Sequence, residues 1–223
     1  ALFYAGKYKE AEAALNKARG LPEDVEGWRT RARVQFALGD QRGAMKSLEA
    51  SNKLDSKDAD TFCEIGAAFV RQGVPDAAMA AYDAAKRENP KAACGKIGAH
   101  VARPFGGKPA VKELEGLIAS PTISSYDEAI ALAAMARVQL NAGLLKEARA
   151  SAEKATQEQP AIGAGWYALG LVAQKQKDEG LALEALGKAV AADAASEPYR
   201  LAYADQLAKG DDEAVKRAIN EYQ

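Results

Sequence analysis

The stretch TFCEIGAAFVRQGVPDAAMAAYDAAKRENP, residues 61–90, predicts two helices joined by a tight turn. Apolar residues recur at helical spacing in 61–71 and again in 76–88. Between these segments, Gly73 can take the left-handed conformation that ends a helix, and Pro75 suits the first turn of the next one. Helices joined by so short a connection must lie antiparallel. The stretch therefore predicts a helical hairpin.

The hairpin pattern repeats along the chain, with a period near that of helix-pair repeats. In each copy a small residue is followed four places later by an apolar and usually larger one, as in Ala78 and Tyr82. The leading alanines of successive copies are separated by 33, 34, 32, 38 and 34 residues, at Ala11, Ala44, Ala78, Ala110, Ala148 and Ala182.

This repeating hairpin resembles the tetratricopeptide repeat, whose signature opens with tryptophan, two residues, leucine and glycine. Trp166, Leu169 and Gly170 match that opening, although Ala173 stands where the signature has tyrosine. A conservative match runs through a whole unit at Phe62, Ile65, Gly66, Phe69, Ala78, Tyr82, Ala85 and Pro90. The resemblance implies an all-α, right-handed superhelical solenoid of about six to seven antiparallel helix pairs, in which residues 1–223 form one repeat domain.

One unit, at about 91–128, departs from the regular pattern. Its turn has the sequence RPFGGKP, residues 103–109, and extra residues precede the following helix. That helix is predicted to be lengthened and to be capped by Ser124 or Ser125. We therefore expect the superhelix to be irregular over 103–128.

The two ends of the sequence are also atypical. The first unit starts inside its first helix, so we expect the natural chain to extend before Ala1 with a leader, an anchor or further repeats. Residues 197–223 lack the signature residues and are expected to form terminal capping helices, because the last repeat must present a polar face to water. The cellular compartment, cytoplasmic or periplasmic, stays open.

The charge and hydropathy of the chain exclude two classes of partner. Thirty basic and 31 acidic side chains leave a net charge of −1, which argues against a sequence-independent grip on nucleic acid. No stretch approaches the roughly 20 apolar residues that span a bilayer. We therefore expect neither nucleic-acid binding nor direct membrane insertion.

The sequence also lacks the residue groups that enzymes and metal sites need. His100 is its single histidine and is expected to be a surface or packing residue. Cys63 and Cys94 have no spacing typical of zinc ligands, and we expect two free thiols in helices. The sequence thus predicts no catalytic residues, no metal and no cofactor.

The resemblance implies that the first helices of successive pairs line a concave face, where a partner protein or peptide binds. The candidate groove residues are the side chains of first helices that point away from their own second helix. They are Arg29, Arg33, Phe36, Val70, Arg71, Arg103, Arg137, Leu140, Asn141, Tyr167, Leu171 and Lys175.

This set is more basic than the whole chain, and two interpretations of it stay open. Arginine forks suit carboxylates and nearby aromatic rings supply anchors, so the groove is predicted to bind a partner with acidic and apolar residues. The alternative is a set of solvated helix residues with a chance excess of positive charge. A subclass of the family clamps the terminal carboxylate of chaperone tails, but the corresponding positions here lack its asparagines and include Glu64.

The sequence thus favours a non-catalytic scaffold or adaptor, bacterial in type, that binds a partner protein or peptide in its concave groove. Two narrower alternatives remain. One is an assembly lipoprotein of the pilotin type, which acts in outer-membrane secretin and type IV pilus biogenesis. The other is a regulatory repeat domain of a larger protein.

Overall fold

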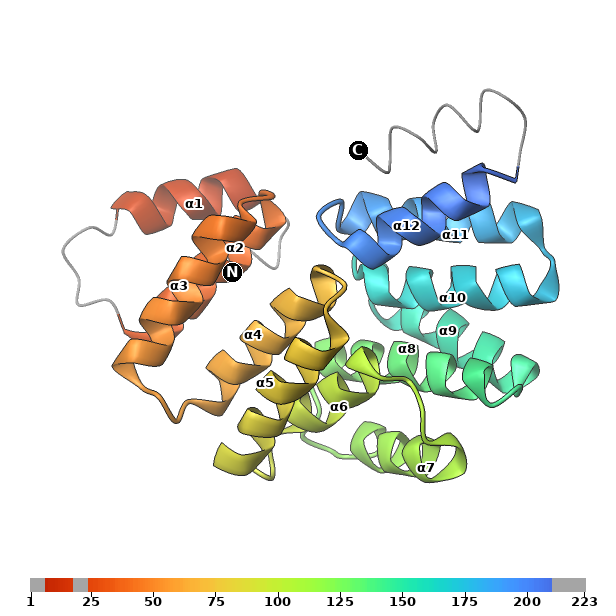
Figure 1. Cartoon of the computed structure of the whole chain (residues 1–223), viewed down its shortest axis with the longest axis horizontal. Coiled ribbons are helices and arrows are strands. Elements are labelled where there is room, and N and C mark those ends of the chain that lie inside the picture. The colour runs from red at the N-terminus through yellow and green to blue at the C-terminus, as the bar shows by residue number, and fades with distance from the viewer. Residues whose placement is uncertain (1–6, 18–23, 210–223) are drawn as a thin grey trace.

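The computed structural model describes residues 7–17 and 24–209, and these ranges form twelve helices without a strand (Figure 1). The prediction of an all-α array is confirmed. The expected helical segment before residue 7 and the second terminal helix after residue 209 lie outside the described residues. The helices are α1 (Tyr8–Lys17), α2 (Val25–Ala37), α3 (Gln41–Leu54), α4 (Ala59–Arg71), α5 (Pro75–Glu88), α6 (Ala93–Ala102), α7 (Gly107–Ile118), α8 (Ser125–Asn141), α9 (Leu145–Glu158), α10 (Gly163–Gln176), α11 (Glu179–Ala192) and α12 (Glu197–Leu207).

The helices pair in chain order, with α2 packed on α3, α4 on α5, α8 on α9 and α10 on α11. Local chemistry sets their ends. The Asp58 carboxylate caps α4 by accepting a 2.8 Å hydrogen bond from the Thr61 N–H. Gly73, at φ +68°, lets the chain turn, and Pro75 then begins α5. Ser124 caps the long helix α8 by accepting a 3.0 Å hydrogen bond from the Asp127 N–H, as one of the two predicted caps.

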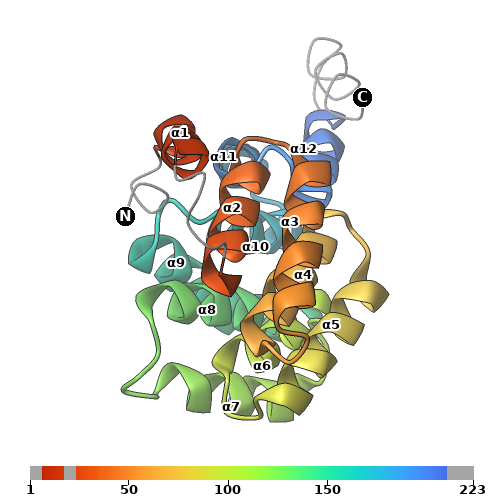
Figure 2. The same cartoon turned by 90° about the vertical axis from the view of Figure 1, so that its left-hand side faces the viewer.

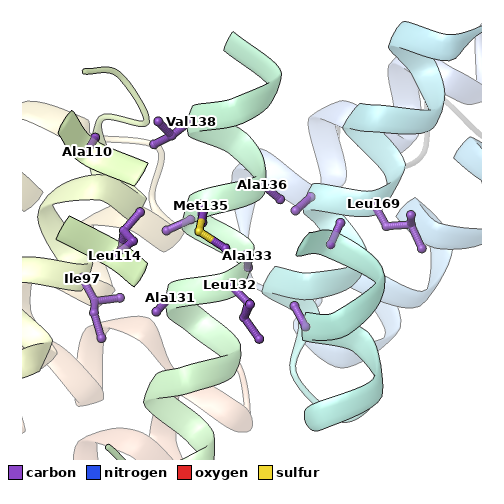
Figure 3. Packing of buried hydrophobic residues seen from close by; sticks show 14 of the residues in the cluster. Ile97, Ala110, Leu114, Ala131, Leu132, Ala133, Met135, Ala136, Val138 and Leu169 are labelled. Atoms are coloured by element: carbon purple, nitrogen blue, oxygen red, sulfur yellow. The ribbon is translucent and has the colours of Figure 1, made fainter. Parts of the chain in front are cut away.

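Helix α8 is the centre of the hydrophobic core. Its Leu132, Met135 and Val138 pack among apolar side chains of α6, α7 and α10 (Figure 3). Alanine supplies much of this core, so the helices cross with little side-chain volume between them. Tyr82 of α5 is packed in the same way against the bare backbones of Gly66 and Gly98, where an added Cβ would lie 2.6 and 2.1 Å from its ring.

Helices α6 and α7 form an opened unit, in which the two helices hardly pack against each other. Helix α6 has 10 residues, and its last turn is followed by an extended loop and two glycines with positive φ, Gly106 and Gly107. As a result α7 packs mainly against α8 and hardly touches α6, while α6 packs on α5 and α8 as the first helices of regular units pack on their neighbours. The Asn141 side chain donates a 2.9 Å hydrogen bond to the Pro104 carbonyl and fixes this loop to the end of α8.

The array closes on itself, since α4 contacts α12, eight helices further along the chain (Figure 1, Figure 2). Arg71, at the end of α4, donates to the Asp193 carboxylate at 2.5 Å. Gln41, at the start of α3, donates to the Ala195 carbonyl at 3.2 Å. Both acceptors lie in the turn between α11 and α12. We call these two hydrogen bonds and the packing of α4 on α12 the closing contact.

The expectation of two free thiols is wrong, because Cys63 and Cys94 form a disulfide with a Cα–Cα distance of 6.0 Å. The bond joins the first helices of two successive units, α4 and α6. Two cysteines are too few for a disulfide framework, but one repeat period separates equivalent positions on adjacent helices. The separation of 31 residues is close to that period.

Replacing Gly98 by alanine should destabilise the fold by about 1–3 kcal/mol, because the new methyl group must displace the buried Tyr82 ring. The matched control is Gly116→Ala in α7, where an added Cβ meets nothing within 4 Å. The control should be neutral or stabilising by up to about 1 kcal/mol, since alanine is the better helix former. Urea unfolding followed by circular dichroism checks both variants. Equal midpoints for the two would contradict the close packing at Tyr82.

Breaking the disulfide should lower the free energy of unfolding by up to about 3–4 kcal/mol, the chain-entropy value for a loop of 31 residues. The double variant Cys63→Ser, Cys94→Ser should therefore melt at a lower temperature than the oxidised protein. A reducing agent should shift the melting temperature of the natural sequence toward that of the variant and leave the variant unchanged. Titration of two thiols in the unfolded, unreduced protein would show instead that the bond is not formed.

Candidate binding channel

A cavity of about 210 Å³ lies where the first helices of five units converge. We call it the central cavity. Its walls are mostly apolar, and they come from α4 and the turn after it, α6, α8, α10 and α12. The lining residues are Val70, Gly73, Val74, Pro75, Val101, Ala102, Ala133, Ala134, Arg137, Ala164, Tyr167, Pro198 and Tyr199. The closing contact brings α4 and α12 to opposite sides of this space, so the cavity depends on it.

Three side chains form a stack on one wall of the cavity. The Tyr167 and Tyr199 rings lie 4.8 Å apart between centroids, and the Arg137 guanidinium lies 5.5 Å from the Tyr167 centroid. Arg137 also donates a 2.8 Å hydrogen bond to the Val101 carbonyl at the end of α6. Burial raises the pKa of both tyrosines, so they stay neutral hydrogen-bonding groups at physiological pH.

Tyr126, at the start of α8, lies near charged groups of α2 and α4. It is 52% exposed, and the surrounding protein and the Glu64 carboxylate raise its pKa to about 12. Arg71 and Arg33 act on the same hydroxyl in the opposite direction. Tyr126 is not among the residues that line the central cavity.

Most of the predicted groove arginines are ion-paired within the protein. Arg33 donates to the Glu64 carboxylate at 2.7 Å, and Arg103 pairs with Asp76. Arg71 pairs with Asp193 and also lies over the Phe36 ring. Burial alone would lower the pKa of Arg71, but the Asp193 carboxylate outweighs that effect and raises it. The expected basic trough is therefore largely neutralised by acidic side chains from other helices.

Arg29 and Phe36 were predicted to line the groove, but both side chains are buried. Arg29 is 9% exposed and pairs with Glu26 and, at 2.6 Å, with Asp58, so it joins α2 to the start of α4. Phe36 is 2% exposed in the core between α2, α3 and α4, where it cannot serve as an exposed anchor. Both side chains stabilise the array rather than face a ligand.

The other predicted residues divide between the cavity and its surroundings. Val70, Arg137 and Tyr167 line the central cavity. Leu140 and Leu171 are half-buried, Asn141 is committed to the Pro104 carbonyl, and Lys175 is exposed on α10. Among the described residues, no carboxylate forms an ion pair with Arg137 or Lys175.

Sequence reasoning missed the small residues and the last helix. Ala133, Ala134 and Ala164 line the cavity, but alanines so frequent in the chain carry no local signal. Pro198 and Tyr199 were assigned to a terminal cap, and only the closing contact brings them to the cavity.

The described ranges contain no group of three or more potential metal ligands. His100 instead lies 3.1 Å from the Glu113 carboxylate and links α6 to α7. Within the same ranges, no helix combines the length and hydropathy needed to cross a membrane.

No protein-family model matches the chain, and no curated protein sequence is significantly similar to it. Its fold, however, occurs in solved structures. Cut9 in the APC/C hetero-tetramer Cut9-Hcn1 superposes with a TM-score of 0.64 at 17% identity, over 99% of this chain and 44% of that one. The chain has the tetratricopeptide-repeat fold.

Two further structures share the tetratricopeptide arrangement. PilW, a widely conserved type IV pilus biogenesis factor, matches with a TM-score of 0.55 at 17% identity, over 89% of this chain and 92% of that one. The human IFIT1 dimer with m7Gppp-AAAA matches with a TM-score of 0.62 at 14% identity, over all of this chain and 57% of that one. The array thus spans about half the length of the Cut9 and IFIT1 chains.

Neutralising the closing contact with Asp193→Asn should destabilise the tetratricopeptide array by about 1–2 kcal/mol. The variant leaves the partly buried Arg71 without its counter-charge, and the loss is smaller than for a fully buried pair because water reaches both groups. Amide hydrogen exchange should accelerate in α12 and at the end of α4. The control is Asp83→Asn, which removes an exposed Asp83–Lys86 pair and should change stability by less than about 0.5 kcal/mol. Unchanged exchange in both helices would contradict a closed array.

Proposed function

We propose that this chain is a non-catalytic scaffold that holds a segment of a partner protein on its concave face, with the central cavity as the main contact. The observation that supports this most is the convergence of five first helices on one apolar cavity. Binding sites in proteins are typically concave and mostly apolar, with a few polar groups that orient the ligand. The central cavity has this character, with Arg137 and two tyrosine hydroxyl groups as its polar parts.

The partner segment is proposed to carry apolar residues and little negative charge. Arg33, Arg71 and Arg103 are neutralised by carboxylates of the array itself, so a strongly acidic segment would compete with existing ion pairs. Arg137 and Lys175 are the cations that favour a carboxylate on the partner. The apolar walls then supply the affinity, and these two charges supply orientation.

The ion pairs of the groove arginines also disfavour RNA as a ligand of the groove. IFIT1 is seen with m7Gppp-AAAA, a molecule with several phosphates. Binding of a polyphosphate needs several uncompensated cations, because phosphate contacts dominate nucleic-acid affinity. Here most of the predicted groove arginines already pair with carboxylates, and the chain has a net charge of −1.

A second candidate is a role in type IV pilus biogenesis, including the pilotin type of assembly factor. Its support is the match with PilW, which covers most of both chains. Deleting the gene from its organism and measuring surface piliation tests this candidate. Unchanged piliation would reject it and leave the general scaffold function in place.

Peptide binding should weaken when the cavity is filled. Purified array is used to select ligands from a peptide library of about 12 residues displayed through its carboxyl end, and the affinities of the selected peptides are measured by calorimetry. Ala164→Leu adds a side chain to the cavity wall and should weaken binding by about tenfold or more, or roughly 1.4 kcal/mol. The control is Ala80→Leu, an exposed position on α5, and should bind within about twofold of the natural sequence. Selected peptides that bind both variants equally would place binding outside the cavity.

A further inference from the structure

Among the residues that the structure describes, Arg137 is the one charged side chain that lines the central cavity. Its Nη1 group donates to the Val101 carbonyl, which uses one of the five N–H donors of the guanidinium. The remaining donors have no carboxylate partner among the described residues. Asp193, the acidic group of the closing contact, is already paired with Arg71. The Arg137 guanidinium therefore lies in a mostly apolar wall and has no anionic partner among the described residues.

The volume of the cavity limits what can enter. The cavity has a volume of about 210 Å³. Pockets for drug-sized ligands and cofactors occupy about 300–1,000 Å³. The cavity is thus smaller than those pockets, and it suits a group of about the size of one apolar amino-acid residue.

We propose that the central cavity binds a monocarboxylate with an apolar body of this size. Its carboxylate would be held by the Arg137 fork, and its apolar part would lie against Val70, Val101 and the alanines of α8. The ligand is either the carboxyl-terminal residue of a partner chain or a free small acid, since both present the same chemistry. The inference rests on the proposed function in taking the same cavity as the contact surface, and it adds the ligand class.

The stack on the cavity wall supports this assignment. Tyr167 holds the guanidinium plane from one side, and the Val101 carbonyl fixes one edge of it. An arginine restrained in this way loses little side-chain freedom when it binds, and it presents its other donors in a fixed geometry that matches a carboxylate. The mostly apolar surroundings strengthen the charge-assisted hydrogen bonds relative to those in water.

One acidic side chain opposes the binding of an anion and gives the proposal a second test. Glu197 lies on the rim, where its carboxyl group is 3.6 Å from the position that a Cβ would take on Gly73, a lining residue. Its charge repels an incoming carboxylate. Removing that charge with Glu197→Gln should tighten the binding of acids and leave the binding of the corresponding amides unchanged.

The test compares acids with amides by calorimetry on the whole chain. The probes are N-acetyl-leucine, N-acetyl-leucine amide, and a five-residue peptide ending in leucine with a free or an amidated carboxyl end. Each acid should bind about tenfold or more tightly than its amide, because charge-assisted hydrogen bonds are stronger than neutral ones. Arg137→Gln should remove that difference, and Glu197→Gln should enlarge it. The control Arg87→Gln, at an exposed site on α5, should keep it.

The two acids distinguish the sources of the ligand. If N-acetyl-leucine and the peptide acid bind with similar affinity, a free small acid is sufficient as the ligand. If only the peptide acid binds, the ligand is the carboxyl end of a partner chain. Equal binding of acids and amides, no binding of either acid, or an acid preference that survives Arg137→Gln would overturn the inference. Library peptides, displayed without a free carboxyl end, can still bind in that case, so failure here is separate from failure of the scaffold function.

Discussion

The packing of each first helix on the next one is the constraint on which the rest of the structure depends. In the regular pairs, a first helix is covered by its own second helix through a turn of a few residues. In the opened unit, the loop at 103–106 separates α6 from α7, while α6 packs on α8 just as α8 packs on α10. The row of first helices bends so that α4 reaches α12 after only four units. The closing contact and the central cavity both follow from that bend.

Several arginines of this array join different helices through ion pairs. Arg29 and Arg33 of α2 are matched by Asp58 and Glu64 in and before α4, and Arg71 is matched by Asp193 across 122 residues. A partly buried arginine is costly unless it is paired, so these pairs specify which helices lie side by side. Arg137, in the wall of the cavity, has no ion-pair partner among the described residues. Because the other groove arginines are paired, we assign the anion of a ligand to Arg137.

Local patterns in the sequence predicted the helices, their turns and the repeat. The glycine and proline of the turn after α4, the Ser124 cap and the alanine period each act over a few residues, and the structure has them where expected. The disulfide was not foreseen, although Cys63 and Cys94 lie about one repeat apart. The neutralisation of the arginines and the burial of Phe36 could not be foreseen, because both depend on how the array curves. Curvature is set by the sum of small rotations and by one opened unit, and no short stretch of sequence encodes it.

The closing contact changes how this array should respond to local unfolding. In an open solenoid each repeat touches only its neighbours, so an end can fray at a cost limited to one interface. Here the opening of α12 also removes partners of α3 and α4, through Gln41 and Arg71. The cost of fraying at one end is therefore shared with units near the other. A repeat protein built in this way gains long-range cooperativity and behaves more like a globular domain than like a linear chain of independent modules.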